Sequence, residues 1–329
     1  MPGGSQPLMP FRTMLEAAQR ILYVQSNLPT TCQIEVTNRC NLSCPMCPRL
    51  IYKVPLVHMD FSLFTKVVDK LRGVRDITLT GWGEPFCHPR ILDMVAYCKH
   101  HRHRVHITTN GVLLTKERIS RLAALGLDSI SFSIDSIKGT GKGHHEQKVV
   151  NNIRAVAVAR QRPLLTIQTT IHHGHENDVY DIIRFAASVR ADSVNLIRLD
   201  TRFVQHLKRP RERDEQAIFR TAERLGKKLG IRVDMVQYAL FTGMVRTGFK
   251  MCKSLLHRGG RYCPKPFNHV YVNVKGDVTP CCSLPKLALG NLMNATLSDI
   301  WQSERFRRFR RSQRAICQGC DMLLPHYTA

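Results

Sequence analysis

The sequence predicts an α/β protein, a partial or full barrel of parallel βα units followed by a smaller domain of different character. Six strand-like runs, each followed by a helix-like run, occupy the chain between about residues 31 and 237. Consecutive βα units join parallel strands through crossovers of one hand, and such units build a barrel or an open sheet. Beyond about Tyr238 the alternation stops and a second group of cysteines follows. We therefore expect a tail and covering helix over residues 1–30, a core over 31–237 and a second domain over 238–329.

The individual elements follow from hydrophobic periodicity. Apolar residues at helical spacing predict a covering helix over residues 11–24. Apolar runs bounded by turn residues predict strands at residues 33–37, 76–80, 104–108, 129–134, 164–171 and 193–199. Helices are predicted after them at residues 61–71, 89–100, 116–125, 148–160, 179–189 and 213–229.

The composition is that of a folded, basic protein. The hydrophobic fraction of 43% over 329 residues is enough for a substantial core. Its 49 Lys and Arg exceed its 25 Asp and Glu, and the net charge of +24 indicates either an anionic partner or a solvated basic face. No run reaches the roughly 18 apolar residues of a membrane span, and the first 30 residues lack a secretory pattern. We expect a cytoplasmic location, where 12 cysteines indicate metal or redox use.

The most informative motif is CNLSCPMC, which places Cys40, Cys44 and Cys47 just beyond the first predicted strand. Three thiolates on one loop make an incomplete metal site, because structural zinc normally takes four protein ligands. A [4Fe-4S] cluster can be held by cysteines with one iron left open. The spacing therefore favours such a cluster. The alternatives are three buried free cysteines, or a zinc loop that borrows a distant ligand.

Motifs at later strand ends fit the rule that active-site residues of a βα barrel lie at the carboxyl ends of its strands. Gly81, Gly83 and Glu84 follow the second predicted strand, and we expect the carboxylate to face the barrel mouth. Asn110 follows the third strand and Asp135 ends the fourth. Each of them alone could be ordinary turn chemistry. Together they predict one functional rim.

A second cysteine group lies in the C-terminal region. An alternating strand over residues 269–274, a Gly-Asp turn and a second strand form a predicted hairpin, and a helix-like segment follows over 297–311. Four sulfurs from this region would close a site that suits zinc as well as iron. The thiols concerned are Cys263, Cys281 or Cys282, Cys317 and Cys320.

Taken together, these residues resemble the radical S-adenosylmethionine (radical SAM) superfamily with a C-terminal SPASM or twitch-type auxiliary iron–sulfur domain. The resemblance runs from about residue 33 to residue 320. Its most specific parts are CNLSCPMC, the glycine-rich stretch over 81–85 and the terminal cysteine pattern. It implies a partial (β/α)6 TIM-like barrel with a small C-terminal β-hairpin plus helix domain for an auxiliary cluster.

The resemblance also implies roles for individual residues. A [4Fe-4S] cluster, whose open iron binds the amino and carboxylate groups of S-adenosylmethionine, would be held by Cys40, Cys44 and Cys47. One auxiliary [4Fe-4S] cluster would be held by Cys263, Cys281, Cys317 and Cys320. The positions that would bind the cofactor are Gly81, Gly83, Glu84, Pro85, Asn110, Ser133 and Asp135. Trp82 makes the glycine-rich signature longer than the usual one.

In this superfamily the reduced cluster cleaves S-adenosylmethionine to a 5′-deoxyadenosyl radical, which abstracts a hydrogen atom from the substrate. A reducing partner such as flavodoxin or ferredoxin is therefore implied. We expect a small or medium polar substrate, which could be anionic, to be oxidised with help from the auxiliary cluster. A second hypothesis is epimerisation with Cys252 as the catalytic hydrogen donor, against the plainer interpretation of Cys252 as a buried thiol.

Two further hypotheses stay open at this point. Peptide maturation ranks third among the reactions, because no separate peptide-recognition domain is evident before Thr31. A rival from another class is a basic zinc-binding module that docks on nucleic acid.

Overall fold

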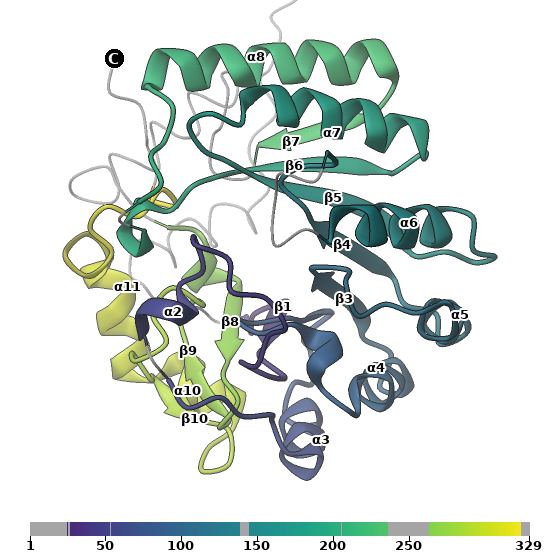
Figure 1. Ribbon diagram of the computed structural model, residues 1–329. Coiled ribbons are helices and arrows are strands. Elements are labelled where there is room, and N and C mark those ends of the chain that lie inside the picture. The colour runs from purple at the N-terminus through teal and green to yellow at the C-terminus, as the bar shows by residue number, and fades with distance from the viewer. Residues whose placement is uncertain are drawn as a thin grey trace, which may run out of the picture.

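The computed structural model describes residues 25, 27–52, 54–138, 145–204, 206–235 and 263–323. Within them, one ten-stranded sheet runs in the order β10-β9-β8-β1-β2-β3-β4-β5-β6-β7 (Figure 1). Strands β1 to β7 follow chain order and pair in parallel, as consecutive βα units require. The connecting helices cover the outer face of the curved sheet. The expected partial barrel is confirmed.

The bounds of the elements are as follows. The strands are β1 Thr31–Ile34, β2 Asp76–Leu79, β3 Arg104–Thr109, β4 Ser129–Ser133, β5 Leu164–Ile171, β6 Ser193–Arg198, β7 Arg232–Met235, β8 His269–Val272, β9 Asp277–Thr279 and β10 Gly290–Asn291. The α-helices are α2 Arg49–Tyr52, α3 Phe61–Asp69, α4 Ile91–His100, α5 Lys116–Ala124, α6 Glu146–Ala157, α7 Glu176–Ser188, α8 Glu212–Leu229, α10 Leu297–Gln302 and α11 Glu304–Ile316. Three short 3-10 helices are η1 Pro85–Cys87, η2 Thr201–Phe203 and η3 Lys265–Phe267. In the described ranges, no helix combines the length and the apolar character that crossing a membrane demands.

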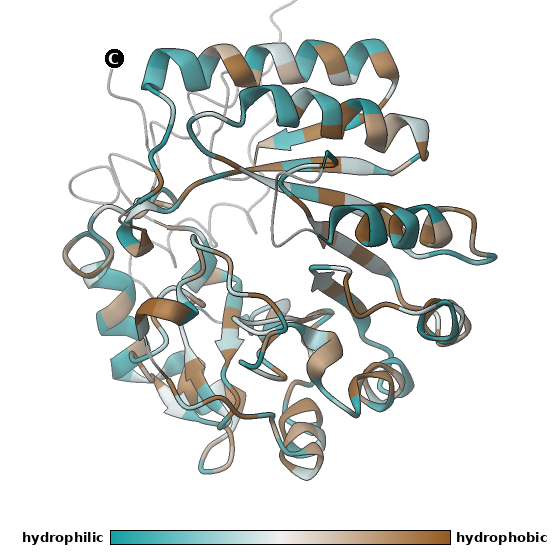
Figure 2. Cartoon of the chain, in the orientation of Figure 1, coloured by the Kyte–Doolittle hydropathy of each residue, from teal (hydrophilic) through white to brown (hydrophobic). Residues whose placement is uncertain are grey.

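The two faces of the sheet differ in chemistry because successive side chains of a strand point to opposite sides. Ile77, Leu79 and Val105 are fully buried and belong to the core cluster that contains residues of the covering helices. The intervening Thr78 and His106 are only half-buried. Figure 2 shows this alternation along the strands. The sheet thus turns its apolar face to the helices and a polar face to the barrel interior.

The C-terminal region continues the barrel sheet. Strand β8 pairs in parallel with β1, with Thr31 opposite His269 and Ile34 opposite Val272. Strands β9 and β10 extend this edge as an antiparallel hairpin. One core cluster also includes Val270 of β8. The predicted hairpin is present. The sheet is continuous between the barrel core and the C-terminal region, because β8 pairs with β1, a strand that lies far away in the sequence.

Two elements differ from expectation. Strand β7 was not predicted, and with four residues it offers too little alternation to be recognised. The predicted helix over 297–311 is two helices, because Ser303 adopts an extended conformation and its side chain accepts a hydrogen bond from the Phe306 amide, which begins α11. The covering helix expected over residues 11–24 lies outside the described residues.

Candidate metal and cofactor centre

The first cysteine loop follows β1 and is shaped by short hydrogen bonds. The Cys47 amide donates to the Cys44 carbonyl over 3.0 Å, which folds the CxxC part into a turn. The Leu42 amide points at the Cys40 sulfur over 3.4 Å, and the Asn110 side-chain amide reaches the same sulfur over 3.8 Å. N–H donors of this kind favour the thiolate form, which is the form that ligates metals. Burial nonetheless raises the pKa of the Cys40 thiol, so metal binding at Cys40 has to displace a proton.

A fourth thiol lies beside this loop. Cys87, in η1, is close enough to Cys40 for their charges to interact, and the Asn41 amide donates to its sulfur. Burial raises the pKa of the Cys87 thiol, and the nearby Glu84 carboxylate adds to this. The residues beside Cys87 in the sequence show no ligand spacing. Only the fold brings it to the first loop.

The glycine-rich loop after β2 packs directly against the start of the cysteine loop. A Cβ atom on Gly83 would lie 2.4 Å from the Arg39 carbonyl and 2.5 Å from the Thr37 carbonyl. A Cβ atom on Gly81 would collide with the Glu35 side chain at 2.3 Å. Glycine at position 83 is therefore explained by close approach of the backbone, and glycine at position 81 by the packing of the Glu35 side chain against it.

Glu84 lies in the wall of the site and not at its mouth. It is 2% exposed, and its carboxylate accepts hydrogen bonds from the Thr109 hydroxyl at 2.7 Å and the Asn110 amide at 2.7 Å. The Phe86 amide donates a third at 3.1 Å. Burial raises the pKa of Glu84, against the effect of these donors. The carboxylate does not face the mouth as expected, because Glu84 is the N-cap of η1 and accepts hydrogen bonds from the end of β3.

Asn110 follows β3, and Ser133 and Asp135 lie at the end of β4, with different surroundings. Asn110 joins β3 to the cysteine loop, since its side chain also donates to the Asn41 side chain at 2.9 Å. Ser133 and Asn110 line the same small cavity of about 10 Å³. Asp135 is buried, and its carboxylate accepts from the Thr170 amide at 3.1 Å.

The second cysteine group converges from three segments. The thiols of Cys263, Cys281, Cys317 and Cys320 lie near enough for charge on one to affect others. Burial raises the pKa of Cys263 to about 11, and of Cys281 and Cys317 to about 12. Cys263 and Cys317 are buried and Cys281 and Cys320 are partly exposed. The four sulfurs form a donor set that suits an iron–sulfur cluster or zinc.

Two cations border the second cysteine group, and sequence reasoning missed both. Burial lowers the pKa of Lys265, but the thiols of Cys282 and Cys281 outweigh it, so the pKa lies above its ordinary value. Arg202, from η2 of the barrel, packs its side chain 3.6 Å from where a Cβ on Gly319 would stand. Arg202 is paired with Asp200 at 2.5 Å. A cluster with four thiolates carries net negative charge, which such cations offset.

The two cysteine regions are physically connected. Tyr52, in the helix after Cys47, stacks on Trp82 with ring centroids 4.7 Å apart. The Tyr52 hydroxyl reaches the Ser283 carbonyl at 3.5 Å, next to the second group. On the other side, Asp321 forms ion pairs with Arg198 at 3.0 Å and with Arg209, which tie the end of the CxxC loop to the β6 rim.

A buried pair also lies between the two regions. Glu35 of the β1 end accepts from the Trp82 amide at 3.1 Å and from the hydroxyl of Tyr271 on β8. Burial raises the pKa of Glu35. A charged residue within an apolar strand run was a usable sequence signal, but its partner on β8 was not.

No set of three or more Cys, His, Asp or Glu side chains in the described ranges has the geometry of a finished metal site. All eleven described cysteines have free thiols. Cys32 and Cys98 are core residues. Cys252, the predicted hydrogen donor, lies outside the described residues. The two cysteine regions are therefore judged to suit an iron–sulfur cluster by the kind and number of their thiols.

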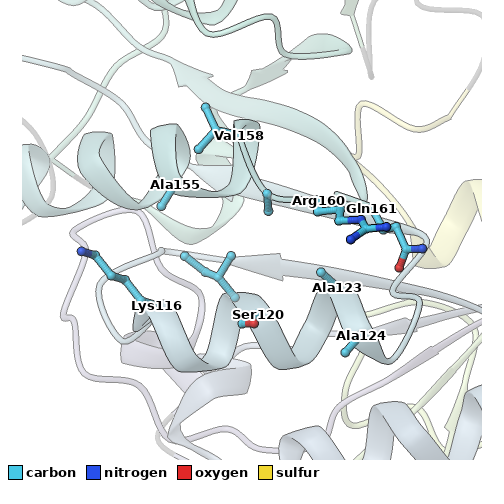
Figure 3. Close-up of a pocket in the computed structure, with 10 residues that line it drawn as sticks. Lys116, Ser120, Ala123, Ala124, Ala155, Val158, Arg160 and Gln161 are labelled. Carbon is cyan, nitrogen blue, oxygen red and sulfur yellow. The ribbon is translucent and has the colours of Figure 1, made fainter.

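A larger groove lies elsewhere, between α5 and α6 on the outer side of the sheet (Figure 3). Its volume is about 500 Å³. Small apolar residues such as Ala123, Ala155 and Val158 line it, with Lys116 and Arg160 at its ends. It contains no carboxylate, thiol or imidazole among its lining residues.

Comparison with known proteins gives a match at each of the two cysteine regions. A family model for the radical SAM superfamily matches residues 34–186, and a model for an iron-sulfur cluster-binding domain, SPASM, matches residues 263–321. The chain is 26% identical to a tungsten-containing aldehyde ferredoxin oxidoreductase cofactor-modifying protein of Pyrococcus furiosus, over 84% of this chain and 82% of that protein. It is 25% identical to the sporulation killing factor maturation protein SkfB of Bacillus subtilis, over 87% and 68%. It is 27% identical to a PqqA peptide cyclase of Streptomyces rochei, over 89% and 81%.

Solved structures share the fold. SuiB of Streptococcus suis, bound to its precursor peptide SuiA, aligns with a TM-score of 0.72 and 14% identity over 98% of this chain and 77% of that one. The AdoMet-bound protein anSMEcpe aligns with a TM-score of 0.65 and 14% identity over 89% and 84%. At these identities the likeness concerns the fold alone.

Proposed function

We propose that this chain, which belongs to the radical SAM superfamily and carries a SPASM iron–sulfur domain, modifies a peptide by oxidation. Its cofactors are [4Fe-4S] clusters and S-adenosylmethionine. When bound, they supply a 5′-deoxyadenosyl radical that takes a hydrogen atom from a substrate carbon. The donor sets of the two cysteine regions are compatible with one cluster each, the first at Cys40, Cys44 and Cys47.

The protein contributes orientation and exclusion of water. Asn110 supports the first loop through the Cys40 sulfur and Asn41. Gly81 and Gly83 let the second strand-end loop lie flat against the start of the cysteine loop. Glu84 fixes the β3 end from below. We infer that backbone and polar groups bind the cofactor, and that the contacts of Asn110, of the two glycines and of Glu84 hold those groups in place. Ser133 and Asp135 lie along the same rim and are proposed to bind the cofactor as well.

The names of two relatives support a peptide as the substrate. SkfB is named as a maturation protein and the PqqA cyclase acts on a peptide. Both relatives align with most of this chain, over 87% and 89% of its length. Peptide maturation thereby moves ahead of the small polar substrate that the sequence alone favoured.

A second candidate is a small polar substrate, and one relative supports it. The Pyrococcus furiosus protein is named as cofactor-modifying, which indicates a non-peptide target. Redox-neutral epimerisation remains a hypothesis, since Cys252 lies outside the described residues.

The proposal is tested with the anaerobically reconstituted protein, S-adenosylmethionine, dithionite and peptides encoded beside its gene. We expect 5′-deoxyadenosine to form and one peptide to lose the mass of two hydrogens. With a peptide deuterated at the modified carbon, the label should enter 5′-deoxyadenosine. Cleavage of S-adenosylmethionine with no change in any peptide, but with label transfer from a small polar metabolite, would replace the first candidate by the second.

The choice between Cys281 and Cys282 gives a separate prediction. We propose Cys281 as the ligand, because its thiol interacts with that of Cys263. Cys281→Ala should therefore lower bound iron from about eight to about four per chain. Cys282→Ala is the matched control and should keep the iron. Iron content and the EPR spectrum of the reduced protein decide, and the reverse pattern would assign Cys282.

A further inference from the structure

We propose that the solvent-exposed side of α11 is the docking surface for an acidic one-electron carrier protein. Arg305, Arg308, Arg311 and Arg314 are all exposed and follow one another at three-residue spacing. Residues three apart are neighbours on a helix surface, so the four side chains form a continuous row, which winds around the solvent-exposed side of the helix. We call these four residues the arginine row. Figure 2 shows α11 mainly in the hydrophilic colour.

The arginine row is poorly neutralised by the protein itself. Glu304 pairs with Arg307 at 3.2 Å and with Arg311. Elsewhere in the described ranges, no carboxylate forms an ion pair with Arg305, Arg308 or Arg314. Like charges at this spacing destabilise a helix. The row therefore has a cost in the isolated protein that an acidic partner would offset.

The opposite face of α11 has a structural role, which separates it from the row. Phe306 and Phe309 are buried in the core. Arg310 is also buried, over the rings of Trp301 at 4.2 Å and Phe306 at 4.3 Å. These residues hold the helix in place and leave the arginine row to solvent.

The position of the row selects the class of partner. The next step of three residues after Arg314 is Cys317, so the row leads directly to the second cysteine group. Arg305 and Arg314 are about 14 Å apart along the helix axis, a size that fits a small, transient electron-transfer contact. Gln318 and Gly319 of the loop between Cys317 and Cys320 are exposed. A carrier bound to the row would lie beside a redox site and not beside the barrel mouth.

This inference rests on the proposed function, because an electron must reach the protein from outside. The reduced carrier would lose one electron and the protein's iron–sulfur centre would gain it. An acidic substrate peptide or a nucleic acid would also be attracted by charge, but neither would need to lie next to the second cysteine group. Charge of this kind acts mainly on the association rate and its dependence on salt.

The test compares two charge-reversed variants of the full-length holoprotein, with an acidic flavodoxin as the probe. The first variant is Arg305→Glu, Arg308→Glu and Arg314→Glu. The second reverses three exposed cations of α8, as Arg220→Glu, Arg224→Glu and Lys228→Glu. At low salt we expect the Kd for flavodoxin to rise about tenfold or more for the α11 variant and to stay near wild type for the α8 variant.

Dithionite separates docking from catalysis. It is a small reductant that needs no docking surface, so dithionite-driven formation of 5′-deoxyadenosine should be equal in wild type and the α11 variant. Iron content and melting temperature check that the variant is folded. An unchanged flavodoxin Kd, or equal weakening in both variants, would overturn the docking proposal. The proposal would also be overturned if the α11 variant lost binding to an RNA oligonucleotide or a poly-glutamate peptide but still bound flavodoxin. Absence of dithionite-driven cleavage in the wild type would instead count against the proposed function.

Discussion

Replacing Cys44 with alanine should reduce cleavage of S-adenosylmethionine to the level seen without enzyme. The loop offers three thiols on a tight turn, and a cluster with one open iron needs all three. Bound iron should fall by about half, from about eight to about four per chain, because the second cysteine group is built from other segments. Iron analysis and quantification of 5′-deoxyadenosine measure the two effects.

Cys87→Ala is the control for this experiment, because Cys87 interacts with Cys40 but lies outside the proposed ligand set. It should keep the iron and cleave S-adenosylmethionine. If Cys87→Ala loses the first centre as Cys44→Ala does, the site is closed by four thiolates. The assignment of an open iron would then be wrong.

Gly83→Ala should damage both stability and cofactor binding. The added methyl group would lie within 2.5 Å of two carbonyl oxygens of the segment that leads into the cysteine loop. Neither backbone can move without displacing Glu84 and its three donors. Overpacking of this kind costs about 1–3 kcal/mol. We expect a lower urea midpoint together with weaker binding of S-adenosylmethionine, measured by calorimetry on the reconstituted protein.

Gly174→Ala separates the effect of the clash from that of an added methyl group. Gly174 has a φ of +87°, but a Cβ there would meet no atom within 4 Å. It should lose about 1–2 kcal/mol, because an L side chain is disfavoured at this positive φ, with cofactor binding unchanged. Equal loss of cofactor binding in both variants would contradict a specific role for the Gly83 contact.

Features that depend on residues close together in the sequence could be predicted, and features that depend on contacts between distant residues could not. Strand β5 was predicted to the residue, because its eight residues alternate strongly and turn residues bound it. The cysteine spacing was likewise a local signal. The pairing of β8 with β1 was not predictable, since it joins residues more than 230 positions apart. The inward turn of Glu84 and the approach of Cys87 to Cys40 depend on the same long-range packing.

The cations around the second cysteine group illustrate a further limit. Lys265 lies two residues from Cys263, but Arg202 comes from the far side of the barrel sheet. In the sequence it is one of 49 basic residues with no distinguishing neighbour. Only the packing of η2 over Gly319 separates it from a solvated side chain.

The pairing of β8 with β1 fixes the distance between the two cysteine regions. Strand β1 leads to Cys40 and the β8 hairpin leads to Cys281, so the register of four residue pairs sets their separation. A slip by one residue would shift one region against the other by about 3.3 Å and would turn Tyr271 away from Glu35. The backbone hydrogen bonds of this one strand pair hold the two cysteine regions at a fixed distance. That distance matters because the rate of electron tunnelling falls steeply as the distance between two redox sites grows.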